Sequence, residues 1–258
     1  MLNFFKKKRV TTEENVKTVS EDYNDVSLIA EYFKNETGVT FDKHTEILKN
    51  KVTAFCRQRE IYSFAKLLEI IKFDSGVKQA LIDNLTTNET FFYREFKQIE
   101  ELVYAVKTGG VSVNILCAPC ATGEEPYSIA IALLEAGVNE NKFHITGIDI
   151  NLDAINKAME AVYRERNLRN LSEEIINRHF TKKDNLYILN NNIKSKVTLK
   201  VLNLFDSSFK NIGKFDYIFS RNMLIYFDKE TKEKAKRILE ELRKNSNQEI
   251  FFGHADLF

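Results

Sequence analysis

The residues best placed to do chemistry surround one turn in the middle of the chain. Residues 115–135 read ILCAPCATGEEPYSIAIALLE, in which an apolar run ends, a turn of small residues follows and an apolar helical pattern begins. Pro126 suits the first turn of this helix, and Gly137 ends it. A strand, a turn and a helix in this order leave unpaired backbone N–H groups at the head of the helix. We expect these groups to face a ligand that approaches over residues 121–123.

An acidic residue follows at a spacing that suits a nucleotide. The next apolar run, FHITGIDI at 143–150, places Asp149 at the end of a second strand, roughly 25 residues after the turn, where a carboxylate binds ribose hydroxyls in doubly wound sheets. The turn has one glycine where the GxGxxG motif has three, so it leaves room for a nucleoside but makes a poor cradle for a pyrophosphate. The turn and the acid favour a nucleoside cofactor over the alternative, a buried unit without a ligand.

Cys117 and Cys120 form a CxxC pattern that has two interpretations, a redox pair or two ordinary buried side chains. Cys117 falls inside the apolar strand, and the third cysteine, Cys56, lies far away in a helical region. Reactive CxxC pairs sit at exposed helix starts, so this placement favours burial. Three cysteines without an extracellular framework also indicate a reducing compartment.

The overall composition excludes several kinds of partner. The chain has 258 residues, 43% hydrophobic and 29% charged, with 38 basic and 37 acidic side chains. A packed globular protein is expected, without a global field that would select nucleic acid or a membrane. The start, MLNFFKKKRV, places apolar residues before basic ones, the reverse of a secretion signal, and no run approaches the ~20 apolar residues that span a bilayer. We expect a cytoplasmic protein with no membrane insertion and no nucleic-acid partner.

The first third of the chain has helical periodicity. Residues 1–22 are polar and unpatterned and are expected to form a flexible arm. The apolar residues that follow define four helical faces: Val26, Ile29, Ala30 and Phe33; Leu48, Val52, Phe55 and Cys56; Phe64, Leu67, Leu68 and Ile71; Val77, Ala80 and Leu81. These faces can be buried only against one another, which predicts a small helical domain over residues 23–85. Asp42 and Ser63 are expected to cap the second and third helices.

The outer surface of the second helix is basic. It carries Lys49, Lys51, Arg57 and Arg59. Composition alone leaves two readings open, an ordinary solvated face or a docking surface.

A joining segment, LTTNETFFYRE at 85–95, combines hydroxyls, an amide, three aromatics and Arg94. Asn88 or Thr87 could simply cap the next helix, but a plain linker would not need the aromatics.

After Asp149, we expect a helix at 152–162, an antiparallel excursion at 181–202, a buried strand at 215–220, a charged helix at 229–243 and a last strand at 250–253. Strands that alternate with helices predict an α/β fold with a mostly parallel sheet, whose ligand lies at the carboxyl ends of the strands.

Five motifs, in this order and at these separations, resemble the bacterial chemotaxis receptor methyltransferase family, CheR: LTTNETFFYRE, CATGEEPYS, GIDI, NLFD and SRNMLIYFD. The resemblance covers roughly residues 25–255. It implies a helical receptor-docking domain at 23–85 and a Rossmann-like class I methyltransferase domain at 86–258, with a small antiparallel β insert at about 181–202. It also implies transfer of a methyl group from S-adenosylmethionine (SAM) to glutamates of the cytoplasmic helical bundle of chemoreceptors. The products are γ-glutamyl methyl esters and S-adenosylhomocysteine. The resemblance implies a monomer that needs no metal.

The resemblance implies a role for particular residues. The cofactor-contacting positions are Asn88, Thr90, Arg94, Glu124, Asp149, Asn203, Leu204, Arg221 and Asn222. Within this set, Glu124 contacts the methionine or ribose portion, Asp149 binds the ribose, and Asn203 with Leu204 flanks the adenine. Arg94 and Tyr226 lie near the reactive methyl group and form the catalytic pair. Lys51 and Arg57 fall on the helix that the family uses to dock on receptors.

This chain departs from the family's pattern in three places. The turn before the last strand is KNSNQ at 244–248 where relatives have a Pro-Gly-Gly type of turn, and the sequence stops at GHADLF where relatives continue into a closing hairpin. The β insert of some members binds a receptor pentapeptide through glycine-containing turns. Here the segment 181–202 has no glycine and five lysines, so we expect no pentapeptide tethering.

Two other functions remain open at this point. One is a SAM-binding or receptor-binding module without turnover, and the other is a methyltransferase for a different acceptor. The single glycine of the turn disfavours a nicotinamide enzyme.

Overall fold

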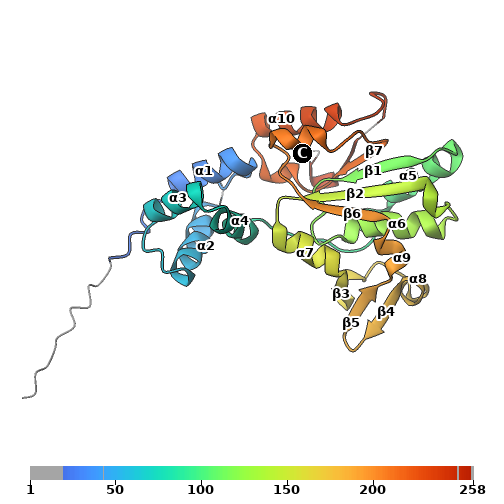
Figure 1. Cartoon of the computed structure of the whole chain (residues 1–258), viewed down its shortest axis with the longest axis horizontal. Coiled ribbons are helices and arrows are strands. Elements are labelled where there is room, and N and C mark those ends of the chain that lie inside the picture. The colour runs from blue at the N-terminus through green and yellow to red at the C-terminus, as the bar shows by residue number, and fades with distance from the viewer. Residues whose placement is uncertain (1–19, 43, 249, 257–258) are drawn as a thin grey trace, which may run out of the picture.

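The structure is a computed structural model that describes residues 20–42, 44–248 and 250–256. It consists of a helical part that lies beside an α/β part (Figure 1). Of the arm expected at residues 1–22, residues 1–19 lie outside the described residues. Residues 20–22 are described and lie against the helical part, where Asp22 bridges to Ser63.

The helical part consists of α1 (Ser27–Thr37), α2 (Thr45–Gln58), α3 (Phe64–Phe73) and α4 (Ser75–Leu85). Their apolar faces pack into one cluster that includes Ile29, Phe33, Leu48, Val52, Phe55, Leu67, Ile71 and Leu81. Ser63 caps α3 as predicted, because its Oγ accepts a hydrogen bond from the Lys66 backbone. The cap predicted at Asp42 is wrong. A turn from Phe41 to His44 precedes α2, so His44 takes the capping position and its side chain makes no capping bond.

The α/β part is built on a five-stranded parallel sheet. Its strands are β1 (Val113–Cys117), β2 (Phe143–Asp149), β6 (Val197–Val201), β7 (Tyr217–Ser220) and β8 (Ile250–Phe252), in the order β6-β2-β1-β7-β8. The chain moves outward from β1 in one direction and then returns to its other side with β7. Such a reversal beside the first strand is where doubly wound sheets bind their ligands. The predicted fold class is confirmed.

Helices cover both faces of this sheet (Figure 1). The long helices are α5 (Phe96–Gly109), α6 (Glu124–Glu135), α7 (Leu152–Glu160) and α10 (Lys229–Glu241). The α/β part also contains shorter helical elements: α8 (Glu173–His179), α9 (Asn191–Lys194), η1 (Glu140–Lys142), η2 (Glu165–Asn167), η3 (Ser207–Asn211), η4 (Leu224–Tyr226) and η5 (His254–Asp256). Side chains alternate between the faces of a strand, so Ile115 and Cys117 join the cluster under α5 and α6, whereas Leu116 joins the cluster under α10. Both faces of β1 are therefore buried.

A small antiparallel sheet follows α7. It contains β3 (Val162–Arg164), β4 (Phe180–Lys183) and β5 (Leu186–Leu189), in the order β3-β5-β4. The antiparallel excursion predicted at 181–202 is confirmed for residues up to Leu189, where β4 and β5 pair in an antiparallel manner. It is wrong for the second strand, β6, which pairs in parallel with β2. As the outermost strand, β6 is partly exposed, and its alternating pattern looks the same as that of an antiparallel strand.

None of the helices in the described ranges is long and apolar enough to cross a lipid bilayer.

The helical part docks on the loops that follow β6 and β7. The backbone of Thr40 donates to the carbonyl of Tyr226 at 2.9 Å, and Val39 forms a bridge with Phe227. At the end of α1, Gly38 has φ +77°, and a Cβ built there would lie 2.4 Å from the Phe205 ring. The two parts therefore approach closely at a residue that has no side chain.

We expect Gly38→Ala to lower the free energy of unfolding by roughly 2 to 5 kcal/mol, because a left-handed alanine costs about 1 to 2 kcal/mol and overpacking about 1 to 3. Gly137→Ala is the matched control, since Gly137 has φ +76° and open space around it. Gly137→Ala should lower the free energy of unfolding only by the about 1 to 2 kcal/mol that a left-handed alanine costs. Urea unfolding of both variants measures the difference, and equal costs would show that the contact with Phe205 does not matter.

Candidate active site

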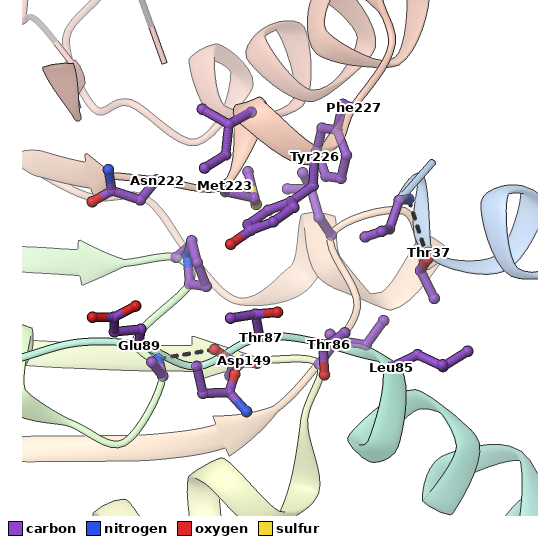
Figure 2. Close-up of a pocket in the computed structure, with 18 of the residues that line it drawn as sticks. Thr37, Leu85, Thr86, Thr87, Glu89, Asp149, Asn222, Met223, Tyr226 and Phe227 are labelled. Carbon is purple, nitrogen blue, oxygen red and sulfur yellow. Dashed lines mark hydrogen bonds between the residues drawn. The ribbon is translucent and has the colours of Figure 1, made fainter. Parts of the chain in front are cut away.

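A cavity of about 570 Å³ lies at the carboxyl edge of the parallel sheet, between the α/β part and the helical part (Figure 2). Figure 2 shows residues that follow β7, among them Asn222 and Tyr226, along one wall, and residues of the joining segment along the other. The ends of β1, β2 and β6 and residues of α1 and α2 complete the lining. Because parallel strands end at the same edge, segments far apart in the sequence meet here.

Asp149 ends β2 at the floor of the cavity and is 5% exposed. Its Oδ2 accepts a hydrogen bond from the backbone N–H of Ala121 at 2.8 Å, and its Oδ1 accepts one from Asn151 at 2.9 Å. Burial raises the pKa of Asp149 to about 6, although these hydrogen bonds oppose the shift. The carboxylate thus holds the turn after β1 in place.

Asn151 is a site-building residue that the sequence analysis missed. It is almost fully buried, caps α7, and its Nδ2 donates to Asp83 and Thr86, which lie at the end of α4 and just after it. This side chain therefore fixes the start of the joining segment against the end of β2. Its place immediately after the strand that ends in Asp149 was the available signal.

The aromatic residues of the joining segment anchor it to the α/β part. Phe92 is fully buried, and its ring meets those of Tyr163 and Phe180 edge to face. The backbone N–H of Tyr93 donates to Ser128 at 2.9 Å. Arg94 lines the cavity, and its Nη1 donates to the carbonyl of Glu89 at 3.1 Å. Anchoring explains why this linker contains three aromatic residues.

Arg221 and Glu125 form a buried ion pair at the end of β7 and the start of α6. Arg221 also donates from Nη1 to the carbonyl oxygen of Arg94 at 2.9 Å. Both partners line the cavity, and within the described part of the chain the Oε1 of Glu125 has no hydrogen-bond partner. Glu125 therefore brings a buried carboxylate to the wall of the cavity.

Glu124, the neighbouring acid, is oriented differently and does not line this cavity. It is fully buried, and its carboxylate accepts hydrogen bonds from Thr122 at 2.6 Å and from Asn167 at 2.8 Å. Burial raises its pKa. Glu124 lies instead on the lining of a second cavity, of about 710 Å³. Of the two adjacent acids, the sequence analysis chose the one that points away from the first cavity.

Part of the cavity lining is apolar. Leu204, which is 8% exposed, Ile150 and Phe227 all belong to it. Asn203 precedes Leu204, donates from Nδ2 to the carbonyl of Glu36 at 2.6 Å and accepts from the backbone of Phe205, so this segment is tied to α1. Apolar side chains with a few polar groups among them suit a planar heterocycle.

The loop after β7 is held by Asp256, a second residue that the sequence analysis missed. Asp256 is 5% exposed, and its carboxylate accepts hydrogen bonds from the backbones of Asn222, Ile225 and Gly253. Burial raises the pKa of Asp256, while these bonds oppose the shift. Tyr226 lies in the same loop, at the cavity wall. The place of Asp256 just after another parallel strand could have marked it.

The structure brings most of the expected site residues together. Those that line the cavity are Lys51, Asn88, Thr90, Arg94, Asp149, Asn203, Leu204, Arg221, Asn222 and Tyr226. Glu124 lies outside it, as described. Arg57 also lies outside, on the exposed side of α2, where its guanidinium pairs with Glu21 at 2.6 Å. Cys117 and Cys120 are buried free thiols whose pKa values burial raises, as the second interpretation of the CxxC pattern predicts.

These groups fit a nucleoside cofactor with a charged amino-acid tail. The cavity is lined by apolar side chains such as Leu204, by the Asp149 carboxylate at the end of β2 and by the Glu125 carboxylate beside the turn. Within the described residues, no group of three His, Cys, Asp or Glu side chains is placed to hold a metal ion. A doubly wound parallel sheet with this site defines the class of SAM-dependent methyltransferases.

Comparison with known proteins specifies the family. The family model described as "CheR methyltransferase, SAM binding domain" matches residues 88–258. A chemotaxis protein methyltransferase of Campylobacter jejuni (strain 81-176) is 36% identical over 226 residues, which cover 86% of this chain and 84% of the relative. Chemotaxis protein methyltransferase 2 of Vibrio cholerae is 31% identical over 240 residues, 88% and 83% of the two chains. The chain belongs to the CheR family of SAM-dependent methyltransferases, as its motifs predicted.

We expect SAM affinity to fall as the pH drops through about 6, by up to tenfold per pH unit. Burial raises the pKa of Asp149 to about 6, and the ribose-binding role that the family resemblance implies for Asp149 requires an ionised carboxylate, which alone accepts two hydroxyl hydrogen bonds. Calorimetric titrations between about pH 8 and pH 5 measure the profile.

Asp149→Asn is the control for this profile. It should bind SAM more weakly at neutral pH, by about 1.5 to 3 kcal/mol, and lose most of the pH dependence. Asparagine has one acceptor oxygen, so its amide N–H₂ would face the backbone N–H of either Ala121 or Asn151, and thermal unfolding of the variant must show that it is folded before its affinity is compared. An identical pH profile in both proteins would remove Asp149 from the cofactor site.

Proposed function

We propose that this protein transfers the methyl group of SAM to glutamate carboxylates of chemoreceptors and so forms γ-glutamyl methyl esters. The observation that carries the proposal is the position of Arg94 in the cavity. The joining segment brings this cation to the strand ends where Asp149 and Tyr226 lie. Membership of the CheR family and relatives named as chemotaxis methyltransferases support the choice of acceptor.

The chemistry needs placement more than proton transfer. A glutamate carboxylate is already ionised at neutral pH, so it can act as the nucleophile without a strong general base. SAM supplies a methyl group on a sulfonium; the carbon–sulfur bond breaks as a carbon–oxygen bond forms. Orientation and removal of water can supply on the order of 7 to 11 kcal/mol of such a barrier. The docking of the helical part over the strand ends supports this requirement.

Arg94 and Tyr226 are the proposed catalytic pair. The hydrogen bond from Nη1 of Arg94 to Glu89 fixes the guanidinium and leaves further N–H groups to orient the acceptor carboxylate. Tyr226 is 37% exposed at the cavity wall, where its ring and hydroxyl can contact a cationic sulfur centre. Figure 2 shows its ring extending from the wall toward the joining segment.

The cofactor itself would be held by groups from five segments. We assign the ribose hydroxyls to Asp149, the adenine to Asn203 and Leu204, and the α-ammonium group to the unpartnered oxygen of Glu125. Asn88, Thr90 and Asn222 remain proposed direct contacts, whereas Glu124, which lies outside the cavity, would act by holding the turn through its hydrogen bond with Thr122. Arg221 would act by positioning, because its guanidinium is already bonded to Glu125 and to the joining segment.

The proposed partner is the cytoplasmic helical bundle of chemoreceptors, which the helical domain at 23–85 would contact through α2. Lys51 lies at the cavity and is the better candidate of the two docking residues, since Glu21 already neutralises Arg57. The protein would act as a monomer in the cytoplasm and without a metal ion.

Incubation with methyl-labelled SAM and receptor cytoplasmic fragments tests the proposal. If alkali releases the label from the protein as methanol, the product is a carboxyl methyl ester. Label stable to alkali would indicate another acceptor, and tight SAM binding without any label would indicate a binding module without turnover. Either outcome would reject the proposed activity.

We expect Arg94→Ala to lower kcat by roughly 100-fold, because a misplaced acceptor loses much of the advantage of orientation. The fold should survive, since the buried aromatics Phe92 and Tyr93 anchor the segment independently. Lys97→Ala, which removes an exposed cation from the following helix, is the matched control and should keep the parental kcat. Ester formation at the parental rate in a saturated Arg94→Ala enzyme would refute the role.

We also expect no tethering to a receptor pentapeptide. An added strand needs an edge whose backbone can be approached, and the β4 edge presents exposed Lys182 and Lys183. Calorimetric titration of the peptide Asn-Trp-Glu-Thr-Phe should give no detectable heat. Micromolar binding that charge reversal at these two lysines abolishes would show that the β insert does capture the peptide.

A further inference from the structure

The second cavity, of about 710 Å³, lies directly beside the first. Residues 88–90 of the joining segment line both cavities, so this segment lies between them. The rest of its lining comes from α7, β3, β5, the head of α6 and residues 165–169. A ligand in this cavity would therefore lie next to the segment that carries Arg94.

Three arginines give this cavity its charge: Arg164, Arg166 and Arg169. All three are exposed, and the arginines that form ion pairs in the described residues are others, namely Arg57, Arg178 and Arg221. The remaining cation of the lining, Lys157, is paired with Asp153 at 2.5 Å. Within the described residues the three guanidinium groups thus form no direct ion pair, although the same lining contains Glu89, Glu124 and Glu160.

A shared aromatic ring connects these arginines to the active site. The guanidinium carbon of Arg169 lies 3.5 Å from the ring centroid of Phe91, and that of Arg94 lies 5.6 Å from the same centroid. Arg169 also donates from Nη1 to the carbonyl of Arg166 at 2.9 Å. Stacking holds a guanidinium in place while its N–H edge stays free to bind a carboxylate. Arg94 and Arg169 therefore lie on one ring, which places the second cavity's cations next to the cation of the active site.

We infer that Arg164, Arg166 and Arg169 form a docking surface for an acidic segment of the substrate protein, adjacent to the glutamate that is methylated. The inference rests on the proposed function, which makes the acceptor a glutamate side chain. Arginine forks bind carboxylates in a bidentate manner, and neighbouring acidic residues of the substrate would supply them. The apolar side chains Val162 and Leu186, 40% and 41% exposed on the same lining, would contact the segment between its charges.

A peptide fits this surface better than a nucleic acid does. The lining also contains Glu89 and Glu160, both exposed. A phosphate backbone carries a charge at every nucleotide and would meet these carboxylates with like charge. A peptide can place its carboxylates opposite the arginines and neutral residues opposite the acids. The surface is also distinct from α2, so it would hold the substrate on the other side of the joining segment.

The double variant Arg164→Glu with Arg166→Glu tests the surface, because within the described residues neither side chain forms an ion pair and the guanidinium groups over Phe91 are those of Arg94 and Arg169. We expect KM for the receptor fragment to rise at least tenfold at low salt, with kcat and SAM affinity near parental values. The parental KM should climb toward that of the variant as salt is added. Lys107→Glu with Arg237→Glu, an equal charge change on α5 and α10, is the control and should leave KM unchanged.

A second measurement does not depend on turnover. A fluorescent helical peptide with several glutamates is titrated with the full chain, alongside its glutamine counterpart. The parent and the control variant should bind the glutamate peptide at least tenfold more tightly than the arginine variant does. Equal peptide binding by both variants would overturn the inference. So would equally tight binding of a single-stranded oligothymidylate to the same arginines.

The two proposals can fail separately. If the parent forms no alkali-labile ester on the receptor, the proposed function fails, whatever the peptide does. If the parent forms the ester and the arginine variant has the parental KM at every salt concentration, only the docking surface fails.

Discussion

The buried ion pair between Arg221 and Glu125 holds together the three segments that build the active site. The Arg221 side chain is 2% exposed and that of Glu125 is 9% exposed. The same guanidinium donates to the carbonyl oxygens of Arg94 and Glu95, so the end of β7, the head of α6 and the joining segment meet at one group. Two charges removed from water cost several kcal/mol each unless their remaining donors and acceptors are bonded. Loss of either partner would therefore disturb all three segments, which is why the position of Arg94 depends on this pair.

A second buried charge fixes the other side of the site. The loop after β7 contains Asn222 at φ +59°, a left-handed conformation that a non-glycine residue adopts at a cost. Three backbone N–H groups converge on Asp256 and compensate for that cost. The segment that carries Tyr226 is thus held by Arg221 at its start and by Asp256 along its length. Catalytic groups on loops need such support, because a loop on its own does not keep its side chains in one geometry.

The sequence predicted those features that depend on local order along the chain. Strand and helix periodicity located β1, β2 and β7, and the carboxyl ends of these strands gave Asp149 and Asn222 as site residues. Features that depend on contacts between distant residues could not be read in this way. Whether Glu124 or Glu125 faces the cavity depends on the rotation of α6 about its axis, since successive helical residues point about 100° apart. The pairing of Arg57 with Glu21 and the bonds of Asp256 appear only when the chain is folded.

The charges around the cavity explain why a cation must come from the joining segment. The site already contains two buried carboxylates, Asp149 and Glu125, besides the exposed Glu89, before any acceptor enters. Each is compensated within the fold, the first by backbone N–H groups and the second by Arg221. A third carboxylate brought into the same cavity would have its pKa raised by desolvation and by these neighbours, and the protonated form is a poor nucleophile. Arg94 opposes that shift at the point of reaction. Because Arg94 and Arg169 lie over the same Phe91 ring, these two cations would together lower the pKa of the acceptor and of an acidic residue beside it. Recognition of an acidic substrate and activation of its glutamate would then depend on one continuous set of arginines.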